Sequence, residues 1–429
     1  MKINKGLVGL SPLLFFIAFY LIASIVAGDF GKVPVVVAFF FASIYAVAIT
    51  KGLSLPDRVR TYGRGSGKTK VMFMLWIFFL AGTFAKSAEA MGCIDETVNC
   101  ILTVLPSKLV YLSIFVAGCF ISFATGSGLG SIVAVGPIAV GVAQACGTSM
   151  PLMCANVVCG AIFGDNLSFI SDTTIIATTT QGCQPRDKFL ANLKIALPAA
   201  LVTAGIYLFL GRGLEPVSVS ESVNYVKIIP YLVVIVLSVI GTDVLILLLS
   251  GTVLCGIMGM AFGDFDFYGW LAALEQGITG MGSLAIIFLM ACGLMEVVRY
   301  NGGLDYLVSI CTKFVRGRKS AEACIALLSG LVCACTSNNT IAIMSVSQVV
   351  KDLSDKFGVE PRKAASLMDS SSCIMLELLP YSTHLLAAAA FAGITASSMI
   401  PFVFYPFTLL VFLIISIIFS RKPKAAAEC

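Results

Sequence analysis

Long apolar runs separated by short polar segments recur along all 429 residues of the chain. A helix of about 20 apolar residues crosses the roughly 30 Å hydrocarbon core of a bilayer, and many of these runs have that length. The short alternating segments of a membrane β-barrel are absent from the sequence. The pattern predicts an all-α polytopic membrane protein with crossings at 7–28, 32–50, 70–90, 151–180, 190–210, 225–241, 243–262, 283–300, 364–392 and 398–420.

Two further apolar stretches, 106–146 and 321–350, are interrupted near the middle by small polar residues. Non-helical backbone at membrane depth is tolerated only where protein or water satisfies its polar groups. We therefore expect each stretch to form a re-entrant hairpin instead of a crossing.

Composition and charge support a membrane location and suggest an orientation. The chain is 58% hydrophobic and 12% charged, with a mean hydropathy of +0.98, well above that of soluble domains. Basic residues gather after the second span and before the second hairpin, at Lys51, Arg58, Arg60, Arg64, Lys68, Lys70, Lys313, Arg316, Arg318 and Lys319. Since basic loops stay in the cytoplasm, we expect a multi-pass protein of a bacterial inner (cytoplasmic) membrane with both termini cytoplasmic. These loop charges also explain the net charge of +5, so no nucleic-acid partner is expected.

The sequence repeats itself at an offset of 210 residues. Identical pairs include Ile77 and Ile287, Phe78 and Phe288, Ala81 and Ala291, Gly92 and Gly302, Asp95 and Asp305, Ser127 and Ser337, Pro151 and Pro361, Ala155 and Ala365, and Thr173 and Thr383. The halves, 1–212 and 225–420, each contain five predicted crossings and one hairpin. Because five is odd, the second half is predicted to be inverted in the membrane, an arrangement suited to alternating access.

The repeat also predicts a pair of ion pairs. Lys86 and Glu89 align with Glu296 and Arg299, so each half would carry one pair with its charges exchanged. Both pairs lie near helix ends, where charged side chains commonly extend toward water, so we interpret them as structural.

Four polar breaks interrupt apolar runs at corresponding places in the two halves. Two are the hairpin tips at 125–131 and 336–340, and two are breaks within 151–180 and 364–392. Their candidate ion- or substrate-binding residues are Gly126, Ser127, Asp165, Asn166, Ser168, Asp172, Thr173, Ser337, Asn338, Asn339, Thr340, Asp369, Glu377, Ser382 and Thr383. Carboxylate, hydroxyl, amide and carbonyl oxygens suit sodium or protons. His384 we interpret as a packed polar group satisfied by helix ends.

The segment 160–174 closely resembles the signature of the NhaC-type sodium/proton antiporters. Their pattern G-D-x-x-S-P-x-S-D-T-T is matched from Gly164 to Thr174, except that Phe169 stands in place of the proline. The resemblance implies the ion-transporter superfamily fold, with a scaffold, a mobile transport domain that moves like an elevator, and a homodimeric assembly. It also implies a sodium site formed by Asp165, Ser168, Asp172 and Thr173.

Two transport functions remain open on these residues. The first is sodium/proton antiport, with Asp165 and Asp172 alternately holding sodium or protons and Glu377 or Asp369 as a third acidic participant. The second is sodium- or proton-coupled transport or exchange of a small amino acid or carboxylate, because the amide-rich tip at Asn338 would suit a carboxylate as well as a cation.

Readings outside transport have weaker support. A serine hydrolase using Ser127 and His384 needs a base within hydrogen-bond reach and an oxyanion hole, and nothing in the sequence requires the two residues to meet.

The glycine-rich run 63–69 is one residue too short for a phosphate-binding loop, and we interpret it as a basic, flexible loop near anionic lipid. We expect no enzyme and no cofactor besides a coupling or transported sodium ion. Asp243 is expected to cap the helix that follows it.

Overall fold

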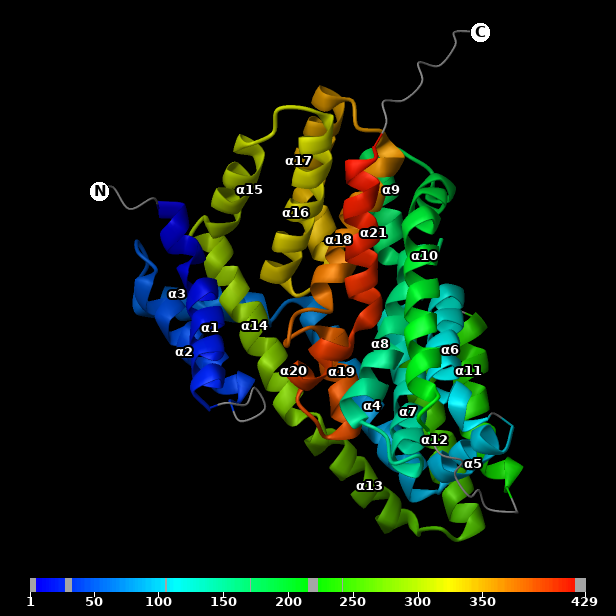
Figure 1. The fold of residues 1–429 in the computed structure, drawn as a ribbon. Helices are drawn as coiled ribbons and strands as arrows, with labels where there is room; N and C mark the ends of the chain where they lie inside the picture. The colour runs from blue at the N-terminus through cyan, green and yellow to red at the C-terminus, as the bar shows by residue number, and fades with distance from the viewer. Residues whose placement is uncertain are drawn as a thin grey trace.

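The computed structural model describes residues 5–27, 33–104, 106–169, 171–214, 223–240 and 242–420, and every regular element in these ranges is a helix (Figure 1). In the first half the α-helices are α1 (Lys5–Ala27), α2 (Val35–Ile49), α3 (Leu55–Ser66), α4 (Thr69–Ala90), α5 (Cys93–Val104), α6 (Val110–Thr125), α7 (Gly128–Ala145), α8 (Met150–Leu167), α9 (Asp172–Gln181) and α10 (Pro185–Gly211).

The second half has eleven α-helices within the described ranges. They are α11 (Ile229–Ile240), α12 (Val244–Phe262), α13 (Phe267–Gly280), α14 (Gly282–Tyr300), α15 (Gly303–Lys313), α16 (Arg318–Thr336), α17 (Asn339–Phe357), α18 (Pro361–Leu376), α19 (Thr383–Ala392), α20 (Ala396–Met399) and α21 (Phe404–Ile418). Helices α5 to α9 begin within two residues of the positions 210 before the starts of α15 to α19. The offset seen in the sequence therefore also relates the helix bounds.

The number of candidate membrane spans is close to the ten crossings predicted. Within the described ranges, nine helical segments are long and apolar enough to cross a bilayer, and a tenth is obtained if α19 and the segment 396–402, which meet at 99°, count as one bent span. The segments differ in detail, because 107–125, 128–145 and 318–336, which we assigned to hairpins, each have the length of a span. An all-helical polytopic membrane protein is therefore confirmed, whereas the hairpins stay a prediction.

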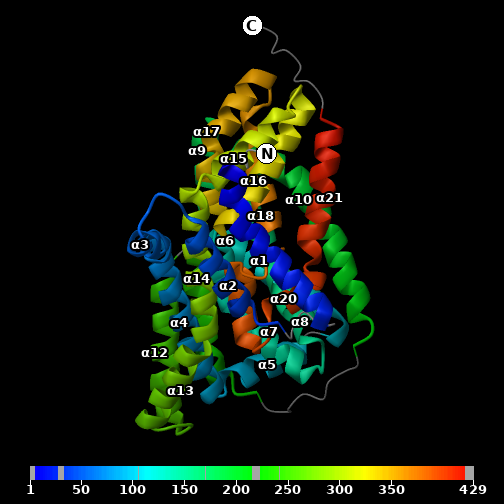
Figure 2. The ribbon, with the colours of Figure 1, turned by 90° about the vertical axis from the view of Figure 1, so that its left-hand side faces the viewer.

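The most enclosed helices lie in the middle of the molecule, where Figure 1 shows α7, α8 and α19. Helices α1, α2, α3 and α14 lie on one side of this centre, and α6, α11 and α12 on the other. In the most apolar window of α7, 89% of the residues are buried, against 33% for α10 at the periphery. Figure 2, turned by 90°, shows that α1 begins and α21 ends toward the same end of the molecule.

Each predicted hairpin tip contains a left-handed residue followed by a capping side chain. Gly126 ends α6 with φ 66°, and the Ser127 hydroxyl then accepts a hydrogen bond from the Gly130 N–H at 3.0 Å. At the corresponding point Ser337 ends α16 with φ 51°, and the Asn338 side chain accepts from the Ile341 N–H at 2.9 Å. The short polar side chains that marked these breaks in the sequence thus cap the helices that follow.

Two expectations are wrong, one about the loop after α2 and one about an ion pair on α14. The predicted flexible loop contains α3, which begins at the N-cap Ser54 and is fixed to α14 because Tyr62 and Ser66 donate hydrogen bonds to carbonyls of that helix. Since α3 packs along α14, Lys68 at its end reaches Glu296, and their 2.5 Å ion pair replaces the predicted pair between Glu296 and Arg299.

Two other local predictions are confirmed. Lys86 and Glu89 form an ion pair at 2.6 Å. Asp243 caps α12, because its carboxylate accepts a hydrogen bond from the Leu245 N–H at 2.8 Å.

Candidate functional site

A polar cavity of about 640 Å³ lies where the helix breaks of both halves meet. It is lined by nine of the residues singled out in the sequence: Gly126, Ser127, Asp165, Asp172, Thr173, Asn338, Asn339, Thr340 and Thr383. Further lining residues come from α4, from the start of α12 including its cap Asp243, and from His384 on α19. The cavity is therefore built from segments far apart in the chain.

Six helices begin at this cavity: α4, α7, α9, α12, α17 and α19 contribute their first residues to its wall. The first N–H groups of a helix have no partner within the helix and carry partial positive charge. Side-chain caps occupy some of these donors, as Ser382 does when its hydroxyl accepts from the Leu385 N–H at 3.1 Å. The cavity thus combines helix ends that attract anions with carboxylates that attract cations.

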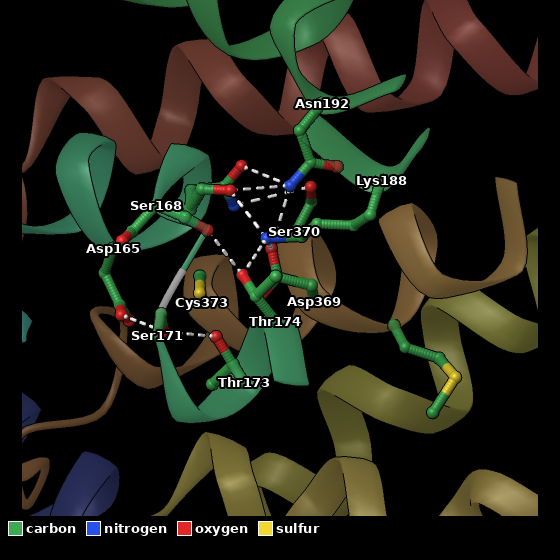
Figure 3. A network of polar contacts seen from close by, with 12 residues as sticks. Asp165, Ser168, Ser171, Thr173, Thr174, Lys188, Asn192, Asp369, Ser370 and Cys373 are labelled. Atoms are coloured by element: carbon green, nitrogen blue, oxygen red, sulfur yellow. Dashed lines mark hydrogen bonds and ion pairs between the residues drawn. The ribbon is translucent and has the colours of Figure 1, made fainter. Parts of the chain in front are cut away.

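Asp165 is the buried carboxylate of the cavity wall, with only 5% of its surface exposed. The Ser171 hydroxyl donates to its Oδ1 at 2.5 Å (Figure 3). The Asn339 amide approaches its Oδ2 at 3.5 Å. Thr173 lies 2.9 Å from the Ser171 hydroxyl, so carboxylate and hydroxyl oxygens gather at one place. Asp172, in contrast, is exposed at the start of α9.

A second buried acid, Glu377, is hydrogen-bonded to the only histidine of the chain. His384 Nδ1 lies 2.6 Å from Glu377 Oε1, and Glu377 Oε2 has no partner among the described residues. A Cβ built on Gly128 would lie 3.2 Å from His384 Nε2 and 3.7 Å from Asp165 Cβ, so these three residues are neighbours. The partner of His384 is a carboxylate and not a helix end, which corrects our interpretation of it as a packed polar group satisfied by helix ends.

Behind the cavity wall lies a buried network around Lys188, a residue that the sequence did not single out. Its ammonium is 2.8 Å from Asp369 Oδ2 and donates to the Asn166 carbonyl and the Thr174 hydroxyl, each at 2.7 Å (Figure 3). Asn192 donates to Asp369 Oδ2 at 2.9 Å and also contacts Asn166. The network joins α8, α9 and α10 of the first half to α18 of the second.

The remaining candidate residues do not line the cavity. Asn166 and Asp369 belong to the Lys188 network, Glu377 pairs with His384, Ser382 caps α19, and Ser337 provides the left-handed residue of the second tip. Ser168 is buried and its carbonyl accepts from the Thr174 hydroxyl at 2.8 Å. Of the four predicted sodium ligands, Asp165, Asp172 and Thr173 share the cavity, and the set as a whole stays a prediction.

The break between α8 and α9 forms without the proline of the resembled signature. α8 ends at Leu167 and α9 begins at Asp172, as Ser168 and Ser171 adopt extended conformations. Phe169 is 41% exposed, and its ring stacks on that of Phe189 with centroids 4.5 Å apart. An aromatic contact with α10 therefore lies where the signature has proline.

Lys188 and Asn192 could have been recognised from one feature of the sequence. They are four residues apart, so a helix places both on one face, and that face borders an otherwise apolar run. A lysine near the end of an apolar run is, however, ordinarily expected to extend toward water. The partner of Lys188, Asp369, lies in the other half of the chain, so the sequence does not show that the two residues meet.

Interrupted helices around a polar cavity in a helical membrane protein are typical of secondary transporters. The family match described next assigns this chain to transporters and not to enzymes. The chain belongs to the Na+/H+ antiporter family, whose sequence model matches residues 6–212 and 216–420. The matched segments nearly coincide with the two halves defined by the 210-residue offset.

Individual relatives are distant but extend over most of the chain. The Na(+)/H(+) antiporter NhaC of Bacillus subtilis is 24% identical over 80% of this chain and 82% of its own. The malate-2H(+)/Na(+)-lactate antiporter of the same organism is 22% identical over 88% of each chain. The crystal structure of the Alcanivorax borkumensis YdaH transporter covers 80% of this chain and 84% of its own, with a TM-score of 0.39 and 13% identity.

Proposed function

We propose that this protein exchanges sodium ions for protons across a bacterial inner membrane by alternating access. The observation that supports the proposal best is Asp165, a buried carboxylate that borders the cavity and has the hydroxyls of Ser171 and Thr173 beside it. Such oxygen donors suit a sodium ion, and the same carboxylate can hold a proton.

Exchange follows if Asp165 binds either sodium or a proton, but not both. An unpaired charge is costly in a low-dielectric interior, so the empty, charged site would resist passing through the membrane. The loaded site, with its carboxylate neutralised, can pass from one side to the other. Asp172 and Asp243, which also line the cavity, raise the local concentration of cations at its entrance.

Alternating access in this proposal depends on the two halves of the chain acting as inverted repeats, with a scaffold and an elevator-like transport domain. The matching helix bounds support the repeat, and the cavity draws residues from both halves. We also propose that both termini are cytoplasmic, in line with the basic loops and with the common end at which α1 begins and α21 ends (Figure 2). A homodimer completes the proposal, because an elevator needs a fixed scaffold.

The test is sodium-driven proton movement in liposomes that contain the purified protein and a trapped pH dye. We expect a sodium gradient to change the internal pH with wild-type protein and with Glu275→Gln, a matched control at an exposed position of α13. Asp165→Asn should abolish the change while its thermal stability stays near that of wild type. A wild-type protein that binds sodium but moves no protons would contradict antiport.

A second candidate function is coupled transport or exchange of a small carboxylate. Two observations favour it: the cavity is far larger than a bare ion, and six helices have their N-terminal ends at its wall. The malate-2H(+)/Na(+)-lactate antiporter among the relatives fits the same idea. Neutralised carboxylates on the cavity wall would admit an anion that the charged wall repels, which would couple cargo to cation.

This alternative is tested by uptake of labelled dicarboxylates and monocarboxylates into the same liposomes, with and without sodium. Asn338→Asp would place a negative charge at the N-terminal end of α17, so it should abolish anion uptake while leaving sodium binding in place. Uptake that is absent for every carboxylate would leave sodium/proton antiport as the function.

A further inference from the structure

The ammonium of Lys188 occupies a position that resembles a cation site. All three of its N–H donors face oxygen atoms, namely the Asn166 carbonyl, the Thr174 hydroxyl and Asp369 Oδ2, at 2.7–2.8 Å. Each of these three residues is buried, as is the whole Lys188 side chain. Carbonyl, hydroxyl and carboxylate oxygens are also the donors that bind small hard cations in proteins.

The helix break supplies one of these oxygens directly. Helix α8 ends at Leu167, so the Asn166 carbonyl belongs to its last turn, where carbonyls lack partners within the helix and the helix dipole favours positive charge. Lys188 reaches this carbonyl from the first turn of α10. A positive charge therefore compensates the break itself as well as the Asp369 carboxylate.

We propose that Lys188 is a built-in substitute for a monovalent cation at the first helix break. The chain fills this site itself, and only the cavity around Asp165 is left for a cation from solution. The inference rests on the proposed sodium-coupled function and makes it more specific, since it assigns one external cation site to the carrier. Asp369 is then a partner of Lys188 and not a ligand of the transported ion.

Two further observations set this network apart from an ordinary structural ion pair. Asp369 Oδ1 and Asn192 Oδ1 are buried without a hydrogen-bond partner among the described residues, so the network holds more acceptors than Lys188 uses. The position 210 residues after Lys188 is Ser398, and the position 210 before Asp369 is Cys159, so the second break has no equivalent pair. The substitution of a cation by lysine is specific to one half.

The inference predicts that removing the lysine creates a cation site. Lys188→Ala deletes the ammonium and leaves space beside Asp369, whereas Lys188→Met deletes the charge but fills much of the space. Both would be made in the Asp165→Asn background, so that sodium at the cavity does not contribute. Thermal unfolding would be measured in choline chloride and then with increasing ammonium, methylammonium, sodium or potassium.

In choline, we expect Lys188→Ala to unfold at a temperature roughly 5–10 °C below its parent, because Asp369 is left as an unpaired buried charge. Small cations should restore the unfolding temperature saturably, with ammonium effective because it presents the same donor group as lysine. The parent and Lys188→Met should show no such cation-dependent recovery.

Several results would overturn the inference. If no cation stabilises Lys188→Ala more than the same cation stabilises the parent, Lys188 is only a structural partner of Asp369. If Lys188→Ala cannot be purified in choline, the variant would be purified in ammonium chloride instead. If it also fails to fold there, while the charge-free double variant Lys188→Gln/Asp369→Asn folds in choline, that result would equally overturn the inference. Absence of sodium-driven proton movement in wild type, with cation rescue of Lys188→Ala intact, would contradict the proposed function and not the cation-like role of Lys188.

Discussion

The two broken helices of this protein occupy corresponding places in the sequence but hold their charges differently. At the first break, Thr174 contacts the ammonium of Lys188, and the pair with Asp369 is wholly buried behind the cavity wall. At the second break, the residue 210 positions after Thr174 is His384, which pairs with Glu377 and lines the cavity. The first pair is thus enclosed by protein, whereas one member of the second pair, His384, borders the space where cargo would bind.

The difference separates two roles that the sequence presents as one set of acidic residues. An enclosed pair with well-placed hydrogen bonds fixes the geometry of a helix break, since neither charge can be removed without leaving the other unpaired. A pair with one member at the cavity wall, as His384 is, instead affects the electrostatic field in which ions bind. Two repeats related by sequence can therefore use their charged residues differently, one to fix the geometry of a helix break and the other to influence ion binding in the cavity.

The largest effect should come from breaking the enclosed pair. Asp369→Asn leaves the Lys188 ammonium uncompensated, and we expect a loss of about 3–5 kcal/mol in the free energy of unfolding. Replacing both partners, as in Lys188→Met/Asp369→Leu, should recover much of that loss because no buried charge remains. Thermal or denaturant unfolding in detergent measures both, and an unchanged stability in Asp369→Asn would contradict the enclosed-pair interpretation.

A smaller effect is expected for the second pair, in which His384 lines the cavity and Glu377 is buried beside it. Glu377→Gln can still accept a hydrogen bond from His384, and a histidine, unlike the lysine beside Asp369, can remain as a neutral partner. We therefore expect a loss of about 1–2 kcal/mol, less than for Asp369→Asn. The same unfolding measurement orders the two variants. A larger loss for Glu377→Gln would reverse the comparison between the breaks.

Accessibility gives a third comparison, using adjacent residues of α9. Thr173 lines the cavity, whereas Thr174 faces Lys188. We expect Thr173→Cys to react with a water-soluble methanethiosulfonate reagent at least about tenfold faster than Thr174→Cys, since only the thiolate that water reaches reacts. Mass spectrometry of the modified peptide distinguishes the new thiol from native ones, and equal rates would show that the enclosed network is open to water.

The smallest effect concerns the hairpin tips. Gly126 and Ser337 share a left-handed backbone, which costs a residue with a Cβ roughly 1–2 kcal/mol. We therefore expect Gly126→Ser to destabilise the protein by about 1 kcal/mol and Ser337→Gly to stabilise it by about the same amount or less, measured by unfolding temperature. Opposite signs would mean that the Ser337 hydroxyl contributes more than the strain costs.

Much of the site could be predicted because polar residues inside apolar runs are costly unless they have a function or a cap. That argument located the tips at Ser127 and Asn338 and the carboxylate of Asp165. It could not separate a hairpin from a crossing, since helices such as α6, α7 and α16 have the length and composition of a span.

Lys188 escaped prediction for a different physical reason. A lysine beside the end of an apolar run is normally placed in water, and nothing local reveals that the chain folds a carboxylate from α18 over it. The Asn166 carbonyl that it satisfies lacks a partner within the helix because α8 ends at the next residue. Contacts between distant segments decide this network, and a single sequence does not display them.

The pairing of Lys188 with Asp369 also has a consequence for how the protein is made. The lysine leaves the ribosome long before α18 does, so the newly inserted first half holds a charged side chain whose partner does not yet exist. Until the second half arrives, this charge must stay in contact with water, lipid headgroups or the insertion machinery. We therefore expect closure of the first helix break to be a late step of biogenesis, and a chain truncated before Asp369 to remain a substrate for membrane quality control.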